Sequence, residues 1–147
     1  MILISENALT PMKMDAVNKF PHECCGFLYG LEEGDLRTIT TVMIAKNNSP
    51  ENLQRRFSIS PEDYLNAENY AWESKLSLLG IYHSHPNHPA IPSEHDRLSA
   101  QPFFSYVIIS VSENYISGMR SWRLNDEQQF YEEQIHQTNS HTIKIKQ

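Results

Sequence analysis

Cysteine is scarce in this sequence of 147 residues, and the two cysteines that occur, Cys24 and Cys25, are neighbours. Adjacent cysteines are poorly placed for a structural disulfide, and their spacing matches no zinc-finger pattern. The sequence therefore argues against a disulfide framework. We interpret the pair as two small buried side chains in a strand.

Long hydrophobic runs are missing as well. The apolar stretches are only a few residues long, far short of the roughly 20 residues that a membrane-spanning helix needs. The opening Met1-Ile2-Leu3-Ile4 has neither the basic flank nor the length of a signal peptide. We therefore expect a soluble, cytoplasmic protein with no membrane association.

Positive charge is in deficit. Twelve Lys and Arg residues stand against eighteen Asp and Glu residues, which gives a net charge of -6 and a pI near 5.6. A surface of this sign repels the phosphates of nucleic acids. We therefore expect no nucleic-acid partner.

What is present suffices for one hydrophobic core. The length is that of a typical single domain, and the apolar residues, 39% of the total, are spread along the chain. We expect one domain over residues 1–135, followed by a polar and flexible tail over residues 136–147.

Periodicity and turn residues predict strands and helices in mixed order. Strands are expected at residues 1–5, 25–29, 36–45, 78–83, 104–111 and 115–124, helices at 9–20, 60–75 and 93–100, and a last strand or helical turn at 128–135. Residues 46–56 are rich in turn formers and are expected to form a surface loop. The fold class is therefore α/β or mixed α+β.

The second predicted helix has a strong start signal. Ser60 is a favourable N-cap and Pro61 suits the first helical position. Further along, Leu65, Trp72 and Leu76 are expected to contact the core.

Two histidines follow the most apolar of the predicted strands. His83 and His85 are two residues apart, so an extended chain points both imidazoles to the same side. Pro86 stiffens the chain that leaves the strand. This spacing predicts a pair of convergent metal-binding nitrogens.

A carboxylate follows the histidines in a helix-start pattern. Ser93 lies three residues before Asp96, which places the hydroxyl and the carboxylate together at the first turn. Two imidazoles and one carboxylate, with a fourth position left for water, are typical of a catalytic zinc site. Such a site also needs a base, and Glu23 is the best candidate because an acid has no packing reason to lie between a helix and an apolar strand.

Together these residues resemble the motif of the JAMM/MPN+ metallopeptidases. The family pattern is a glutamate, then His-x-His-Pro and then Ser-x-x-Asp, which here is Glu23, His83-Ser84-His85-Pro86 and Ser93-Glu94-His95-Asp96. The resemblance extends over residues 1–125 and includes the Pro-x-Glu-x-Cys-Gly segment at residues 21–26. It implies a central mixed β-sheet flanked by helices, similar to the cytidine deaminase-like architecture.

The resemblance also implies roles for these residues. His83, His85 and Asp96 would bind one Zn²⁺ per chain, Glu23 would act as general base on the metal-bound water, and Ser93 would donate to the oxyanion. The implied activity is hydrolysis of a peptide or isopeptide bond after the C-terminal Gly-Gly tail of a ubiquitin-like or sulfur-carrier protein. Only seven residues separate Asp96 from the next predicted strand, so the chain is similar to the compact prokaryotic members.

Other functions fit less well. The metallo-β-lactamase pattern needs an acid where Asn87 stands, and the zinc deaminases need His-x-Glu with Pro-Cys-x-x-Cys. A non-catalytic MPN scaffold in a protein complex remains the alternative, although such members typically lack the metal ligands. His88 and His95 are interpreted as loop and helix-surface histidines, and Arg55 and Arg56 as exposed loop charges that could contact an acidic partner. The substrate, the leaving group and the oligomeric state stay open.

Overall fold

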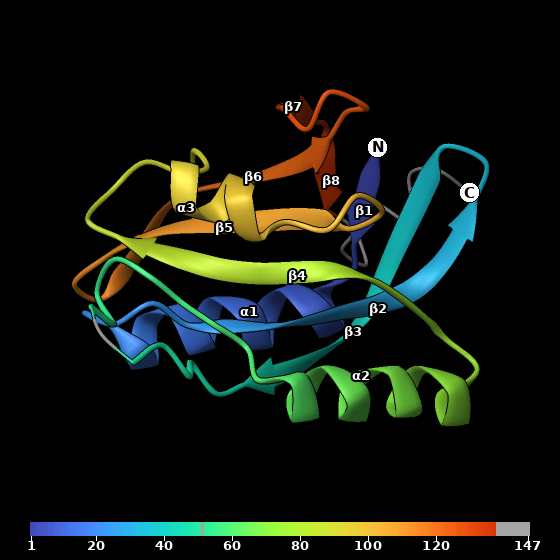
Figure 1. Ribbon diagram of the computed structural model, residues 1–147, viewed down its shortest axis with the longest axis horizontal. Coiled ribbons are helices and arrows are strands. Elements are labelled where there is room, and N and C mark those ends of the chain that lie inside the picture. Colours follow the sequence, from blue (N-terminus) through green and yellow to red (C-terminus); the bar gives the residue numbers. More distant parts are fainter. Residues whose placement is uncertain (51, 138–147) are drawn as a thin grey trace.

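The computed structural model describes residues 1–50 and 52–137 (Figure 1). Strands and helices occur in the mixed order that the sequence predicts. In chain order they are β1 Ile2–Ile4, α1 Glu6–Lys19, β2 Cys25–Glu33, β3 Leu36–Ala45, α2 Pro61–Ser74, β4 Ser77–Pro86, α3 Glu94–Ser99, β5 Ser105–Ser112, β6 Tyr115–Leu124, β7 Phe130–Glu133 and β8 Ile135–Gln137.

The described strands form one mixed sheet in the order β7-β6-β5-β4-β2-β3-β1-β8. β4 lies in the middle, antiparallel to β2 and parallel to β5. Because both its neighbours are long strands, β4 is buried from Leu79 to Pro86. A mixed sheet flanked by helices confirms the predicted fold class.

α1 and α2 cover opposite faces of the sheet (Figure 1). Side chains of a strand alternate between the two faces. In β4, Tyr82 therefore packs in the core under α1, whereas Ile81 packs in the core under α2. His83 shares the face of Ile81, so the histidines lie on the α2 side.

α2 begins as predicted but buries a different side. The Ser60 hydroxyl accepts a hydrogen bond from the backbone of Asp63, which confirms the cap. The expected core contacts of Leu65 and Trp72 are wrong, because these side chains are 57% and 87% exposed.

The helix instead turns its small residues to the sheet. Ala67 and Ala71 are buried, and their size allows the close approach in which the Tyr29 hydroxyl donates to the Ala67 carbonyl at 3.0 Å. Leu76, the third expected contact, is partly buried against the same core.

Two strands are longer than expected. β2 continues to Glu33 before a tight turn at Gly34, and β4 continues to Pro86, so both histidines lie inside the strand. The segment 128–135 holds β7 and the start of β8. Of the expected tail, His136 and Gln137 belong to β8, and the rest lies outside the described residues.

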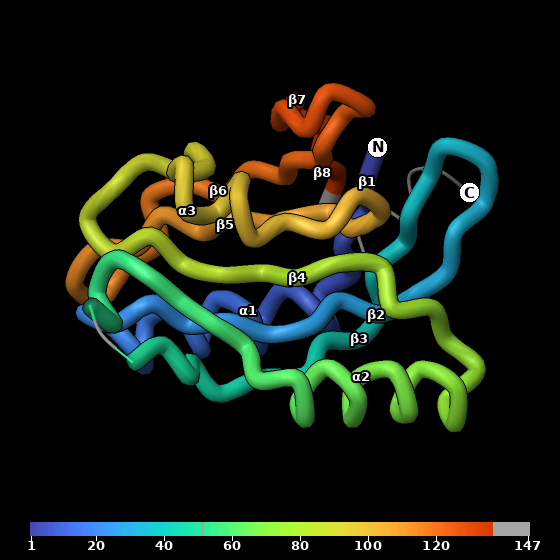
Figure 2. The backbone as a smooth tube through the Cα atoms, in the orientation of Figure 1, coloured from blue at the N-terminus to red at the C-terminus, as the bar shows by residue number. Residues whose placement is uncertain are grey.

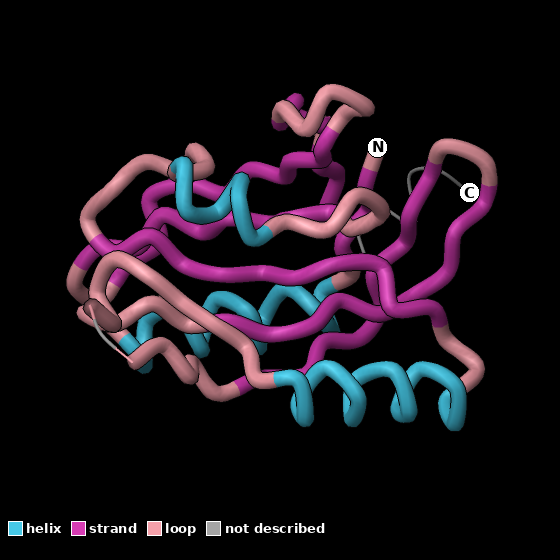
Figure 3. Tube along the Cα trace, viewed as in Figure 1, coloured by secondary structure: helices cyan, strands magenta, loops and turns pink. Residues whose placement is uncertain are grey.

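Loops gather at the end of the sheet where β4 finishes (Figure 3). The connection from β3 to α2 and the connection from β4 to α3 both reach this end (Figure 2). Among the described residues, no helix is both long and apolar enough to cross a membrane.

Candidate functional site

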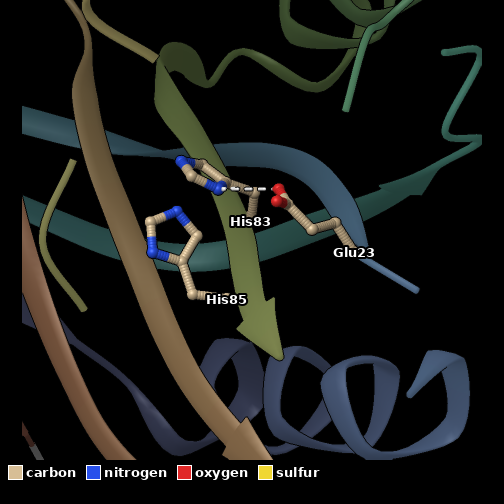
Figure 4. Close-up of side chains that lie close together, drawn as sticks. All are labelled: Glu23, His83 and His85. Carbon is tan, nitrogen blue, oxygen red and sulfur yellow. Dashed lines mark ion pairs between the residues drawn. The ribbon is translucent and has the colours of Figure 1, made fainter. Parts of the chain in front are cut away.

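Two histidines project from β4 on the same face of the sheet (Figure 4). His83 is 1% exposed and His85 is 8% exposed, and their ring centroids are 5.1 Å apart. The ring of Phe57 stacks on His83 with a centroid distance of 4.4 Å. The imidazole pair predicted from the sequence is therefore present, buried and convergent.

Glu23 reaches the histidines from the segment just before β2. Antiparallel pairing sets Cys25 opposite His83. Beyond that pair, the backbone N–H of Cys24 donates to Ser84 Oγ at 2.8 Å, and the N–H of Ser84 donates to the Cys24 carbonyl at 3.1 Å. This double link sets the Glu23 carboxylate beside His83, with Oε1 3.5 Å from Nδ1 (Figure 4).

The loop between β3 and α2 holds the backbone of Glu23 from the other side. The N–H of Glu23 donates to the Leu53 carbonyl at 2.7 Å, and the Asn47 amide donates to the Glu23 carbonyl at 3.1 Å. Asn47 also donates to the Arg56 carbonyl at 3.0 Å and accepts from the N–H of Ser58 at 3.2 Å. This part of the predicted surface loop is therefore built onto the site.

Asp96 approaches from the first turn of α3. Its N–H donates to Ser93 Oγ at 3.0 Å, and its carboxylate accepts from the N–H of Ser93 at 2.8 Å, which is the predicted capping box. The box orients the carboxylate toward β4. Asp96 Oδ2 lies 3.1 Å from His85 Nε2, and Oδ1 lies 3.9 Å from His83 Nε2.

The contact between His85 and Asp96 requires a cation or a proton. His85 Nδ1 lies 2.9 Å from the carbonyl of Pro89, which can only accept, so Nδ1 carries the hydrogen. In the neutral ring, Nε2 is then an acceptor that faces another acceptor at 3.1 Å. Either a proton on the ring or a metal ion between the two atoms relieves this conflict.

The electrostatics of the pair follow from this geometry. Burial disfavours the charged form of His85, but its hydrogen bonds to Asp96 and Pro89 and the nearby negative charges outweigh burial and raise its pKa. Burial likewise opposes ionisation of Asp96, yet His83, His85 and the N–H of Ser93 together hold the pKa of this carboxyl well below its usual range. The site thus favours an ionised carboxylate next to imidazole.

Two buried atoms of the site lack partners among the described residues. Glu23 Oε1 and His83 Nδ1 make no hydrogen bond there, although buried polar groups are normally satisfied. Glu23, His83 and His85 each offer one ligand atom, and these atoms lie within 4.8 Å of one another. Asp96 is not part of this group, but it lies close to Nε2 of both histidines.

The donor set is compatible with a metal ion. Imidazole nitrogen and carboxylate oxygen are the ligands of catalytic zinc, at bond lengths that separate tetrahedral ligands by roughly 3.4 Å. The distances of 3.1 Å and 3.9 Å from Asp96 to the two imidazoles lie on either side of that value. Cys24 and Cys25 stand outside the group as free thiols that are buried as expected, but only Cys25 lies in a strand, because β2 begins there and Cys24 precedes it.

Two hollows reach the histidines of the site. The larger has a volume of about 480 Å³ and is lined by His83 and Asp96 together with the apolar side chains of Phe57 and Ile59. The smaller has a volume of about 220 Å³ and includes Glu23, His85 and Ser93 in its wall. The hollows share no lining residue, so the site can be approached from two directions.

Four basic side chains near the site also line these hollows. His88 and Arg55 border the smaller one, and His95 and Arg56 border the larger one. Neither His88 nor His95 belongs to the metal-compatible group found in the described part of the chain.

Three residues of the site were missed from the sequence. Asn47 belongs to the predicted loop, which offered only turn residues, and Phe57 directly follows that loop. Ser84 was seen only as the spacer between two histidines. A small hydroxyl residue at an inward position of a buried strand is a usable signal for Ser84, since a buried hydroxyl must find a partner. No local pattern identifies Asn47 or Phe57, because their contacts are with distant segments.

A search against protein families gives a clear match. Residues 6–125 match the family described as prokaryotic homologs of the JAB domain. The matched segment contains every residue of the site described above.

Individual proteins and solved structures are also similar to this chain over most of its length. A desampylase of Pyrococcus furiosus is 32% identical over 115 residues, which cover 77% of this chain and 74% of that protein. A solution structure of a protein from Desulfitobacterium hafniense superposes with a TM-score of 0.84 and 30% identity, over 95% of this chain and 94% of that one. A JAB1/MPN domain protein from Archaeoglobus fulgidus, at 17% identity and a TM-score of 0.57 over 92% and 98% of the two chains, shares the fold.

Proposed function

Because this chain belongs to the prokaryotic JAB family, and thus to the JAMM/MPN+ group that its motif resembles, we propose that it is a zinc-dependent isopeptidase or peptidase. The bond cleaved is the one after the C-terminal Gly-Gly tail of a ubiquitin-like or sulfur-carrier protein. The observation that carries the proposal is the convergence of Glu23, His83, His85 and Asp96, all buried, at one end of β4.

The positions of the two carboxylates suggest different roles. Asp96 faces Nε2 of both His83 and His85, so these three residues would hold one Zn²⁺ per chain. When bound, the ion supplies Lewis-acid activation of water and of the scissile carbonyl. Glu23 faces Nδ1 of His83 instead, so its carboxylate is available to accept and donate protons.

Glu23 is suited to act as a general base because its reactive oxygen has no competing hydrogen bond among the described residues. It takes a proton from the attacking water and returns it to the leaving amine. Its backbone is held in place for both steps by the double link between Cys24 and Ser84, by its own N–H bond to the Leu53 carbonyl and by the bond that Asn47 donates to its carbonyl.

Ser93 is placed to stabilise the oxyanion. Its Oγ accepts the capping bond from Asp96, which leaves its hydroxyl hydrogen available to donate. Its side chain is exposed and lines the smaller hollow beside Glu23 and His85. Loss of one such donor typically lowers turnover by about 100- to 1,000-fold.

The substrate class rests on the relatives. The similar protein of Pyrococcus furiosus is named a desampylase, and the similarity spans most of both chains. An extended Gly-Gly tail lets the backbone come close to a metal centre without side-chain clashes.

The test is incubation of the zinc-loaded protein with ubiquitin-like and sulfur-carrier proteins that carry C-terminal extensions, read by mass spectrometry. We expect loss of the extension directly after Gly-Gly with the wild type and a rate at least roughly 100-fold lower with Glu23→Gln. A protein that binds no zinc and cleaves none of these substrates would instead be a scaffold.

A further inference from the structure

The smaller hollow has a positive charge beside the candidate catalytic groups. Its wall combines Glu23, His85 and Ser93 with the side chain of Arg55. Its volume of about 220 Å³ is less than half that of the larger hollow. A hollow of this size suits one amino-acid residue rather than a folded chain.

The position of Glu23 gives the direction in which a substrate would lie. The group that returns the proton must face the leaving amine. Glu23 lines the smaller hollow and is absent from the wall of the larger one. A third hollow, of about 420 Å³, also has Glu23 in its wall, but it reaches neither of the two histidines and neither Ser93 nor Asp96. The leaving group therefore occupies the smaller hollow, and the tail occupies the larger hollow, which has Phe57 and Ile59 as apolar contacts.

Arg55 lies on the loop that also holds Glu23, and its side chain is part of the wall of this hollow. The backbone N–H of Arg55 donates to the Asn52 carbonyl at 3.0 Å. Leu53 lies between these two residues in sequence, and its carbonyl accepts a hydrogen bond from the backbone N–H of Glu23 at 2.7 Å. Arg55 and Glu23 are thus positioned by one short segment. Within the described part of the chain, the Arg55 guanidinium has no hydrogen bond or ion pair, although the protein carries net charge -6.

We propose that Arg55 binds the free α-carboxylate of the leaving group, so that the substrate is a ubiquitin-like protein extended by a single residue after Gly-Gly. This inference rests on the proposed hydrolase function. Water adds its oxygen to the glycine carbonyl carbon as the C–N bond breaks, and Glu23 carries the proton from the water to the departing nitrogen. The products are the Gly-Gly carboxylate and a free amino acid, whose carboxylate matches the planar fork of a guanidinium.

The experiment compares two short peptides that end in Gly-Gly-Ala, one with a free carboxylate and one with a carboxamide. With zinc-loaded wild type, we expect kcat/KM to be about fivefold higher for the carboxylate, the upper range for a solvent-accessible ion pair. Arg55→Gln should reduce this ratio to about one, because an amide cannot replace the charge. Arg56→Gln is the matched control and should keep the ratio, since Arg56 lines the other hollow. A ratio within one variant is insensitive to partial loss of active protein.

A binding arm separates failure of the inference from failure of the proposed function. The Arg55 Nε–Hε signal is followed by NMR while each peptide is added. A shift with the carboxylate peptide alone, without cleavage of either peptide, supports binding of a terminal carboxylate by Arg55 and counts against the hydrolase proposal. Equal cleavage of both peptides, or a carboxylate preference that survives in Arg55→Gln, overturns the inference and leaves the hydrolase proposal standing. Absence of cleavage together with absence of a selective shift overturns both.

Discussion

Asn47 shows how much one side chain contributes to the site. Its amide donates to the carbonyls of Glu23 and Arg56, and its oxygen accepts from the N–H groups of Ser49 and Ser58. These four contacts join the loop between β3 and α2 to the candidate base. A single residue thus couples loop conformation to the position of a carboxylate.

We predict that Asn47→Ala lowers kcat at least roughly tenfold, because a misplaced base costs far more than the hydrogen bonds themselves. The free energy of unfolding should fall by about 1–3 kcal/mol, since partly buried backbone groups lose partners. Urea unfolding and steady-state kinetics measure the two effects. Asn48→Ala is the control, because the side chain of Asn48 makes no such bonds within residues 1–50 and 52–137. Unchanged kcat in Asn47→Ala would contradict this account.

The two thiols make a second prediction at this scale. Burial, followed by the charge of Asp15, raises the pKa of Cys25 to about 12, and burial raises the pKa of Cys24 as well. A raised pKa keeps both thiols protonated at neutral and mildly alkaline pH, and the thiolate is the reactive form. Iodoacetamide at pH 8 should therefore modify neither cysteine in the folded protein and both in denaturant, as counted by mass spectrometry. Rapid labelling of native Cys24 or Cys25 would show that one of them is accessible.

Among the elements, α2 shows where a sequence pattern fails. Hydrophobicity alone selected Leu65 and Trp72 as core residues, yet the helix buries Ala67 and Ala71. Two aromatic contacts fix this orientation, Phe27 with Tyr64 at 5.5 Å and Tyr29 with Tyr70 at 4.9 Å. These partners lie on β2, far away in sequence, so the helix alone gives no sign of its true inner face.

The exposed side of α2 is expected to tolerate change. Trp72→Gln should alter the free energy of unfolding by less than about 0.5 kcal/mol, because the indole is 87% exposed. Ala67→Leu should instead cost about 1–3 kcal/mol by overpacking the contact with Tyr29. Chemical denaturation of both variants provides the comparison. A larger loss of unfolding free energy for Trp72→Gln than for Ala67→Leu would mean that α2 buries the face that carries Trp72.

The elements that carry the site were easier to predict. The capping box of Ser93 and Asp96 and the alternation of His83 and His85 are local features, and both are present as expected. The distance between Glu23 and His83 depends on the register of β2 against β4. Register is a long-range property, so the residues alone could select Glu23 only as an acid without a packing role, and the resemblance to a family supported its place at the site.

The whole molecule combines a rigid central strand with loops from two connections. The eight-stranded order could not be read from the sequence, because β1 pairs with β8 across more than a hundred residues. The mixed class, in contrast, followed from the order of strands and helices. The sheet buries β4, and the loops at its end leave two hollows that reach the histidines.

A bound ion should stabilise this arrangement as a whole, since it would relieve the contact between two acceptors, His85 Nε2 and Asp96 Oδ2, which lie 3.1 Å apart. At a free zinc concentration 100 times the dissociation constant, linkage adds about 2.7 kcal/mol to the free energy of unfolding. Chelation should therefore lower the melting temperature of wild-type protein in calorimetry. His85→Ala should melt at the same temperature with and without chelator, and an equal response in both proteins would place the metal elsewhere.

The most direct measurement is the zinc content per chain, by elemental mass spectrometry after loading and removal of excess metal. We expect one zinc per chain in the wild type and in Glu23→Gln, and close to none in His85→Ala or Asp96→Ala. Wild-type protein without zinc, or full zinc retention after loss of His85 or Asp96, would contradict the claim that these residues form a metal centre.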